Sequence, residues 1–221
     1  MSSSKDLRGF YNSVFTMEGG GSWEDAPGKA VFIQALQSYL NEGRISSDSQ
    51  IVEIGCGSGG LLSRINEEVI PNEFDLYGVD FSNEAVRLCR NKHKYIRVFC
   101  EDGSNTHFED EQFDVVVSYG AYEHFTTPQR AIEELGRILR VGGVFLCMMP
   151  TLGIYRTDRT DEGWYEDLSP NAEVPRQMQW NLLRTTWEAY FSASGLILDS
   201  IEQTKHYGAE KPGVFFFGTN E

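Results

Sequence analysis

Short apolar runs alternate with amphipathic stretches along most of the chain. Five runs of five or six residues, rich in Val, Ile and Phe, are typical of buried strands: 50–54, 74–79, 96–100, 113–118 and 144–149. Four stretches predict helices: 27–40, 61–69, 82–92 and 127–139. Strands that alternate with helices pair in parallel through right-handed crossovers. The pattern therefore predicts an α/β fold with a mostly parallel sheet.

The ends of the chain and the segment 151–179 depart from this alternation. Residues 1–45 predict an N-terminal helical cap, whose aromatic residues before Gly19 belong either to a helix packed on the sheet edge or to a lid over a pocket. Residues 151–179 show no periodicity, which is typical of a lid or substrate loop. Residues 180–221 predict a helix, 180–194, and an antiparallel strand pair, 196–201 and 214–217. With 221 residues, the chain 1–221 is expected to form a single domain.

Small and polar residues mark the boundaries of several predicted elements. Ser82 and Thr127 stand immediately before predicted helices, where their hydroxyl groups are suited to capping, and Pro128 follows at a first helical position. Gly142 and Gly143 predict a turn into the strand 144–149.

Four glycines, at positions 55, 57, 59 and 60, follow the first predicted strand directly. A strand, a glycine turn and a helix in this order are typical of a nucleotide-like binding site, because the turn lets a ligand approach the backbone. The spacing alone also fits a dinucleotide. Glu53 argues against one, because its carboxylate would repel a pyrophosphate. Asp80 and Asp102 end the next two strands, so the three acids favour a cationic nucleoside without phosphates.

The overall charge narrows the range of partners. Nineteen basic and 33 acidic side chains give a formal net charge of −14, which disfavours a nucleic-acid substrate. No apolar run reaches the roughly 20 residues that span a bilayer, and the N-terminus has no apolar signal core. Four widely spaced cysteines without a Cys-x-x-Cys pair predict reduced thiols and a cytoplasmic location.

Five motifs together resemble a known family. They are Val-Glu-Ile-Gly-Cys-Gly-Ser-Gly at 52–59, Gly-Val-Asp-Phe-Ser at 78–82, Glu-Asp-Gly at 101–103, Phe-Asp-Val-Val-Val-Ser at 113–118 and Leu-Arg-Val-Gly-Gly at 139–143. Their order and spacing are similar to those of class I S-adenosylmethionine-dependent methyltransferases, in particular the small-molecule branch of the ubiquinone- and menaquinone-biosynthesis enzymes. The resemblance covers residues 50–150, the expected cofactor-binding core. It implies a Rossmann-like, seven-stranded, mostly parallel sheet with an antiparallel last strand and helices on both faces.

The resemblance also implies which residues bind the cofactor S-adenosyl-L-methionine. Ten positions match the family pattern: Glu53, Gly55, Cys56, Gly57, Gly59, Asp80, Phe81, Asp102, Gly103 and Tyr119. The glycine turn would face the methionine and ribose, Asp80 would accept the ribose hydroxyls, and Phe81 would pack on adenine. Asp102 would take the adenine amine, and Tyr119 would border the methionine. Glu53 would lie beside the methionine end or support the turn.

Glu123 and His124 are the candidate catalytic residues. They follow the fourth predicted strand, on the ligand side of the sheet, and a Glu-His pair at this place matches the family pattern. A hydroxyl acceptor must lose its proton, and a positioned histidine or carboxylate can take it. The alternative is that His124 is structural and binds a backbone carbonyl group. Relatives that hold a divalent metal have a carboxylate where this chain has Gly120, so no metal is expected.

Six aromatic and basic side chains in the segment 151–179 would surround the acceptor: Tyr155, Arg156, Arg159, Trp164, Tyr165 and Arg176. They would enclose an aromatic acceptor and pair with its carboxylate or phosphate, or the arginines would merely neutralise nearby acids. His206 and Tyr207 would also reach the acceptor, unless they only pack.

The sequence as a whole predicts methyl transfer to an oxygen, nitrogen or carbon atom of a small molecule. One alternative is a nicotinamide-dependent oxidoreductase, which Glu53, Asp102 and the lack of a second catalytic half disfavour. The other is a non-catalytic regulator that only binds S-adenosylmethionine. Neither the acceptor nor the oligomeric state follows from the sequence.

Overall fold

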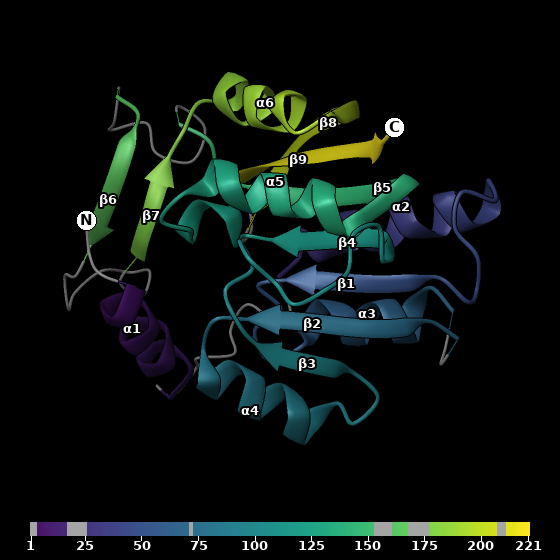
Figure 1. Cartoon of the computed structure of the whole chain (residues 1–221), viewed down its shortest axis with the longest axis horizontal. Coiled ribbons are helices and arrows are strands. Elements are labelled where there is room, and N and C mark those ends of the chain that lie inside the picture. The colour runs from purple at the N-terminus through teal and green to yellow at the C-terminus, as the bar shows by residue number, and fades with distance from the viewer. Residues whose placement is uncertain (1–3, 17–25, 71–72, 153–160, 168–176, 207–210) are drawn as a thin grey trace.

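The computed structural model describes residues 4–16, 26–70, 73–152, 161–167, 177–206 and 211–221. Its centre is a seven-stranded sheet with the strand order β3-β2-β1-β4-β5-β9-β8 (Figure 1). The strands are β1 (Gln50–Ile54), β2 (Asp75–Asp80), β3 (Arg97–Cys100), β4 (Phe113–Tyr119), β5 (Leu139–Met149), β8 (Leu196–His206) and β9 (Lys211–Asn220). The first five pair in parallel, and β9 is antiparallel to both β5 and β8. The predicted fold class is confirmed, including the antiparallel last strand.

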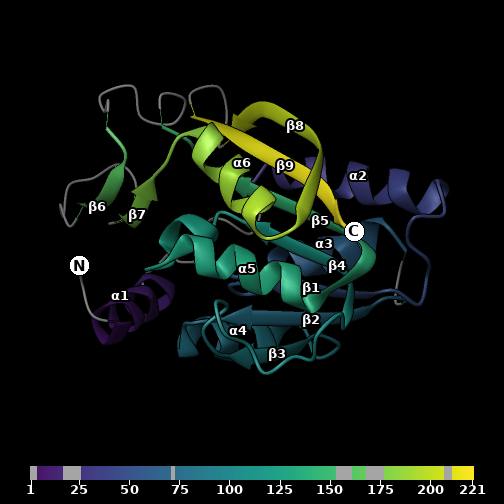
Figure 2. The same cartoon turned by 45° about the horizontal axis from the view of Figure 1, so that its top comes forward.

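Helices cover both faces of the sheet (Figure 2). Side chains of α2 (Lys29–Asn41), α3 (Gly60–Glu68) and α4 (Asn83–Lys92) share one core with one face. Side chains of α5 (Pro128–Ile138) and α6 (Arg184–Ala193) share a second core with the other face. Val115 and Val116, neighbours on β4, enter different cores and are fully buried. Burial on both faces explains the run of three valines at the centre of β4.

The remaining elements lie beyond the carboxyl ends of the parallel strands, where Figure 1 shows the arrowheads of β1, β2 and β4. They are α1 (Ser4–Thr16), the short 3₁₀ helix η1 (Tyr122–His124), and a separate antiparallel pair, β6 (Gly163–Asp167) with β7 (Gln177–Asn181). η1 follows β4 directly, and β7 packs against it. Ligands of parallel α/β sheets bind at this edge, so these elements border the expected site.

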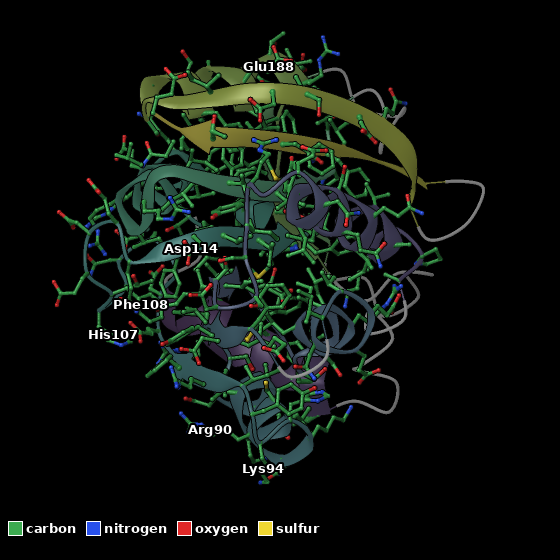
Figure 3. The ribbon with its side chains drawn as sticks, turned by 90° about the vertical axis from the view of Figure 1, so that its right-hand side faces the viewer. Arg90, Lys94, His107, Phe108, Asp114 and Glu188 are labelled. Carbon is green, nitrogen blue, oxygen red and sulfur yellow. The ribbon has the colours of Figure 1, made fainter. Side chains whose placement is uncertain are left out.

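A polar network fastens the opposite edge of the sheet, which faces the viewer in Figure 3. The Asp114 carboxylate, at the start of β4, accepts the backbone N–H group of Gln50 at 2.8 Å and the Arg140 guanidinium. These bonds connect the beginnings of β1, β4 and β5. At this edge Asp114 thus has a structural role.

Three predictions about local structure need correction. The segment 151–179 contains β6 and part of β7, and the last helix begins at Arg184 because Trp180 and Asn181 belong to β7. Gly142 and Gly143 form no turn between elements, because β5 already begins at Leu139 and its register against β4 shifts between Phe113 and Val115. The glycines therefore lie in an irregularity of the strand.

The two predicted helix caps differ in the structure. The Ser82 hydroxyl accepts the Ala85 N–H group, as predicted. Thr127 precedes α5, with Pro128 at its start, but makes no capping hydrogen bond through its side chain. The predicted helix before Gly19 exists as α1, but it packs against α4 at the carboxyl edge of the sheet.

Within the residues that the structure describes, no helix is both long enough and apolar enough to cross a membrane. All four cysteines are free thiols, in agreement with the predicted reduced state.

Candidate active site

The glycine turn between β1 and α3 has a shape that other residues cannot adopt without strain. Gly55, Gly57 and Gly59 have φ angles of +77°, +54° and +90°, in the left-handed region that disfavours side chains. A Cβ atom on Gly55 would lie 2.3 Å from the Ala121 side chain, and one on Gly59 would lie 2.8 Å from the Cys89 sulfur. The turn is thus packed against Ala121, the residue before η1, on one side and against α4 on the other.

Asp80, the last residue of β2, holds this turn in place. One carboxylate oxygen accepts the Gly57 N–H group at 2.8 Å, and the other accepts the Ser82 N–H group at 2.8 Å. Burial raises the pKa of Asp80 to about 6, although both hydrogen bonds act in the opposite direction. A carboxylate has about four lone-pair sites, so Asp80 can still accept a ribose hydroxyl group.

Glu53 is the most deeply buried of the three predicted acids, with 3% of its surface exposed. Its carboxylate takes a hydrogen bond from the Leu62 backbone in the first turn of α3, and the buried Lys29 ammonium favours its charged form. Burial nevertheless raises its pKa to about 8. The Oε2 atom has no hydrogen-bonding partner in the structure. Glu53 therefore supports the turn with one oxygen and leaves the other available.

The predicted adenine residues lie around the end of β3. Asp102 is exposed, and its Oδ1 atom accepts the N–H and hydroxyl groups of Ser104. Gly103 is buried, and a Cβ atom there would lie 2.6 Å from the Ile54 side chain. The Arg8 guanidinium of α1 stands 4.3 Å from the centre of the Phe81 ring. An aromatic ring and a carboxylate thus stand at neighbouring strand ends.

Glu123 and His124 lie together in η1. The His124 Nδ1 atom is 2.8 Å from the Met178 carbonyl oxygen, so it carries the proton and donates it to that oxygen. Its Nε2 atom lies 3.7 Å from Glu123 Oε1. Burial lowers the pKa of His124 to about 4, against the effect of the Met178 hydrogen bond. The imidazole is therefore neutral at pH 7 and anchored to β7.

Glu123 has a different environment. It is 3% exposed, its Oε2 atom has no hydrogen-bonding partner, and burial raises its pKa to about 8. The negative charge of Glu123 contributes to raising the pKa of Tyr119, the predicted methionine-site residue at the end of β4, so the two side chains are close. A carboxyl group with this pKa exchanges its proton near neutral pH.

Helix α1 contributes residues that were not among the predicted cofactor-binding or catalytic residues, although its aromatic residues were candidates for a lid. The Tyr11 hydroxyl donates to the Met178 carbonyl oxygen at 3.1 Å, and its ring packs edge-on against His124. The Asn12 Oδ1 atom accepts the Ser82 hydroxyl group at 2.8 Å. Phe15 lies next to Gly57. The i, i+3, i+4, i+7 spacing of Arg8, Tyr11, Asn12 and Phe15 was a signal for one functional helix face.

Five of the residues predicted to contact the acceptor lie outside the described residues: Tyr155, Arg156, Arg159, Arg176 and Tyr207. Tyr165 belongs to β6 and His206 to β8, and the description of these two residues is limited to their strands. Trp164, on β6, packs edge-on against Trp180 of β7, with ring centres 5.8 Å apart.

Comparison with known proteins indicates the family of the chain. A family model for a methyltransferase domain matches residues 52–147. The chain is 30% identical over 155 residues to a phthiotriol/phenolphthiotriol dimycocerosates methyltransferase of Mycobacterium tuberculosis, an alignment that covers 66% of this chain and 44% of the relative. A solved S-adenosylmethionine-dependent methyltransferase from Methanosarcina mazei has the same fold, with a TM-score of 0.67 at 17% identity, over 82% of this chain and 96% of that one.

The chain carries a class I S-adenosylmethionine-dependent methyltransferase domain. The family that the motifs resembled is thereby confirmed, and with it the cofactor of that family, S-adenosylmethionine. The chain is also 39% identical over 111 residues to the human protein described as a probable tRNA methyltransferase 9B, covering 49% of this chain and 22% of that protein. The chain thus spans less than half the length of either relative.

The residues of the methyltransferase domain fit the cofactor chemically. The sulfonium and the amino group of S-adenosylmethionine are cationic, and the buried Glu53 and Glu123 carboxyl groups each have an unpartnered oxygen. Asp80 retains acceptor capacity at the end of β2. No group of three or more acidic, histidine or cysteine side chains suited to a metal ion occurs in the described part of the chain. The absence of a required metal stays a prediction.

Replacing Asp80 by alanine is expected to weaken the binding of S-adenosylhomocysteine by roughly 1–3 kcal/mol. The substitution removes the acceptor for two backbone N–H groups and for the ribose. Isothermal titration calorimetry would measure the change. Asp75→Ala, at the exposed beginning of the same strand, is the matched control and should leave the affinity unchanged. Equal affinities of the two variants would contradict the role of Asp80.

Replacing Glu123 by glutamine is expected to flatten the pH dependence of stability. Because the folded-state pKa of Glu123 is about 8, above its ordinary value, the folded protein retains a proton that the unfolded chain loses. The free energy of unfolding therefore falls as the pH rises from 5 to 8, by at most about 1.4 kcal/mol per pH unit for this group. Urea titrations at several pH values would measure the slope. Glu133→Gln, on the exposed side of α5, should keep the wild-type slope.

Proposed function

We propose that this protein transfers a methyl group from S-adenosylmethionine to an oxygen, nitrogen or carbon atom of a small molecule. The observation that carries the proposal is the placement of Glu123, a buried carboxyl group with a free oxygen, at the carboxyl edge beside a glycine turn that Asp80 holds. A cofactor turn and a proton-exchanging group at the same edge of one sheet are the parts that such a transfer needs.

Ten residues are proposed to hold the cofactor, in the roles that the family pattern implies: Glu53, Gly55, Cys56, Gly57, Gly59, Asp80, Phe81, Asp102, Gly103 and Tyr119. The geometry of Asp80 supports the ribose contact, and the unpartnered Glu53 oxygen supports a contact with the amino group of the methionine. Because the Arg8 guanidinium covers the Phe81 ring, either both adenine and Arg8 pack on that ring or Arg8 moves away from it.

A small molecule is favoured over nucleic acid by charge. The net charge of −14 opposes a phosphate backbone. The name of the Mycobacterium tuberculosis relative refers to a phthiotriol acceptor, and the name of the human relative refers to tRNA. The longer alignment, with the first of these, supports the small-molecule acceptor. Both relatives are longer than this chain, so the acceptor rests on the chemistry of the site.

Glu123 and His124 have different roles in the proposed reaction. When bound, S-adenosylmethionine supplies a methyl carbon whose bond to sulfur breaks with the electron pair left on sulfur. Glu123 accepts the proton that an O–H or N–H acceptor loses as its bond to the methyl carbon forms. His124, fixed by its bond to Met178, is a positioning residue for the carboxyl group and for β7. The burial of Glu123 excludes water from the reaction.

The function is tested by incubating the protein with S-adenosylmethionine labelled in the methyl group and with a small-molecule extract or an RNA extract. Label in the small-molecule fraction is expected. Label only in RNA would overturn the small-molecule acceptor. Tight S-adenosylhomocysteine binding without any labelled product would favour a regulator, and binding of NAD alone would favour an oxidoreductase.

The reaction is expected to be faster at higher pH. Glu123 must be deprotonated to accept a proton, and its pKa is about 8 in the protein without cofactor. The positive sulfonium lowers this pKa, so kcat/KM should rise with pH and level off at or below about pH 8. Glu123→Gln should lose roughly 10²–10⁴-fold in kcat together with this pH dependence. A variant that retains the wild-type pH profile would exclude Glu123 as the base.

Substitutions at His124 distinguish positioning from proton transfer. Asparagine keeps an N–H group near the place of Nδ1, which can still donate to the Met178 carbonyl oxygen, but it lacks Nε2. His124→Asn is therefore expected to keep kcat within a few-fold of wild type, whereas His124→Ala should lose roughly tenfold, as expected for one lost hydrogen bond. S-adenosylhomocysteine affinity should be unchanged in both. An equal loss in both variants would assign the chemistry to Nε2.

A further inference from the structure

Six buried side-chain atoms have no hydrogen-bonding partner within the described part of the chain: Glu53 Oε2, Tyr122 Oη, Glu123 Oε2, Thr151 Oγ1, Asn181 Nδ2 and Trp187 Nε1. Three of them, on Glu123, Thr151 and Asn181, belong to η1 and to the segments that meet at β7. Each atom exposes less than 1 Å², and the three residues are 3%, 2% and 5% exposed. Leaving a buried polar group unpaired costs roughly 1–3 kcal/mol. Three such groups in one region call for an explanation, and a ligand that pairs with them is the simplest one.

The segments that carry these atoms are joined to one another. Leu152, next to Thr151, donates its N–H group to the Leu182 carbonyl oxygen at 2.8 Å, which brings Thr151 to the end of β7 where Asn181 lies. β7 packs against η1, which carries Glu123. Gly120, just before η1, donates to the Met148 carbonyl oxygen near the end of β5. Figure 1 shows the arrowhead of β4 pointing toward the side of the molecule on which β7 lies.

The unpartnered atoms of Glu123, Thr151 and Asn181 are suited to binding a neutral polar group. The Gln179 side chain donates to Asn181 Oδ1 at 3.4 Å, so Asn181 Nδ2 is a donor in need of an acceptor. The Thr151 hydroxyl both donates and accepts. Burial favours the neutral form of Glu123, and no cation among the described residues contributes to its pKa shift. A carboxylate or phosphate would therefore find no opposite charge here.

We propose that Glu123, Thr151 and Asn181 form the acceptor subsite, and that it takes a neutral hydroxyl group on an apolar body. A hydroxyl group can accept from Asn181 and donate to Glu123 or Thr151, which one carboxylate or one ammonium group cannot do. Tyr119 and Met148, both buried, border Glu123 and supply the apolar surroundings. This inference rests on the proposed function and narrows its acceptor to oxygen.

Three probes with one apolar body test the subsite: 2-naphthol, 2-naphthoate and 2-naphthylmethylammonium. Calorimetry on the full chain, saturated with S-adenosylhomocysteine, would give their Kd values. We expect 2-naphthol to bind at least tenfold more tightly than either charged probe. Thr151→Val, which removes the hydroxyl group at nearly constant shape, should weaken 2-naphthol binding about 5- to 20-fold. Thr151→Ser should restore it.

Asn181→Asp is a second variant, because it keeps the acceptor for Gln179 and removes the donor N–H groups; it should weaken 2-naphthol binding to a similar extent. S-adenosylhomocysteine affinity should be unchanged in every variant. A preference for 2-naphthoate, no binding of 2-naphthol, or unchanged 2-naphthol binding in both Thr151→Val and Asn181→Asp would overturn the subsite while leaving the methyltransferase proposal standing. Failure of the wild-type chain to bind S-adenosylhomocysteine would overturn the proposed function instead.

Discussion

The interaction on which the site depends is the pair of hydrogen bonds that Asp80 accepts. The carboxylate at the end of β2 binds the N–H group of Gly57 in the turn after β1 and that of Ser82 at the start of α4. Val79, one residue earlier, accepts the N–H groups of Gly55 and Cys56. Three of these four bonds thus fix the glycine turn relative to β2, and the fourth fixes the start of α4. Burying Asp80 is unfavourable, as its raised pKa shows, so this fixed geometry is obtained at a cost in stability that a bound ligand can offset.

Two further acidic side chains of the site are also buried at an electrostatic cost. Glu53 and Glu123 are both buried, and burial raises the pKa of each to about 8. Each keeps one oxygen without a partner. An anionic ligand beside these two carboxyl groups would raise the energy of their ionised forms further. A cation favours their ionised forms and so recovers part of their desolvation energy, which makes the acidic site specific for a positively charged cofactor.

The sequence predicted the parts of the fold whose signal is local. A parallel strand buried on both faces is mostly apolar, and β1 and β4 were therefore found nearly to the residue. β7 was missed because one of its faces carries two buried polar residues, Gln179 and Asn181. Met178 and Trp180 lie on the opposite face. The composition of β7 therefore resembles an irregular loop. The hydrogen bond between Tyr11 and Met178 spans 167 positions, a separation at which no spacing rule applies.

The Met178 carbonyl oxygen explains why the acceptor side was harder to predict than the cofactor side. It accepts hydrogen bonds from Tyr11 of α1 and from His124 of η1, so three segments from distant parts of the chain meet at one backbone atom. The same helix α1 contacts the cofactor side through Asn12 and Phe15. A shift of α1 on cofactor binding would therefore act on His124 and β7 directly. The predicted cofactor residues lie at successive strand ends and form motifs that can be recognised in the sequence. The residues around Met178 are instead held together by hydrogen bonds to a backbone carbonyl oxygen, and every residue type has such an oxygen.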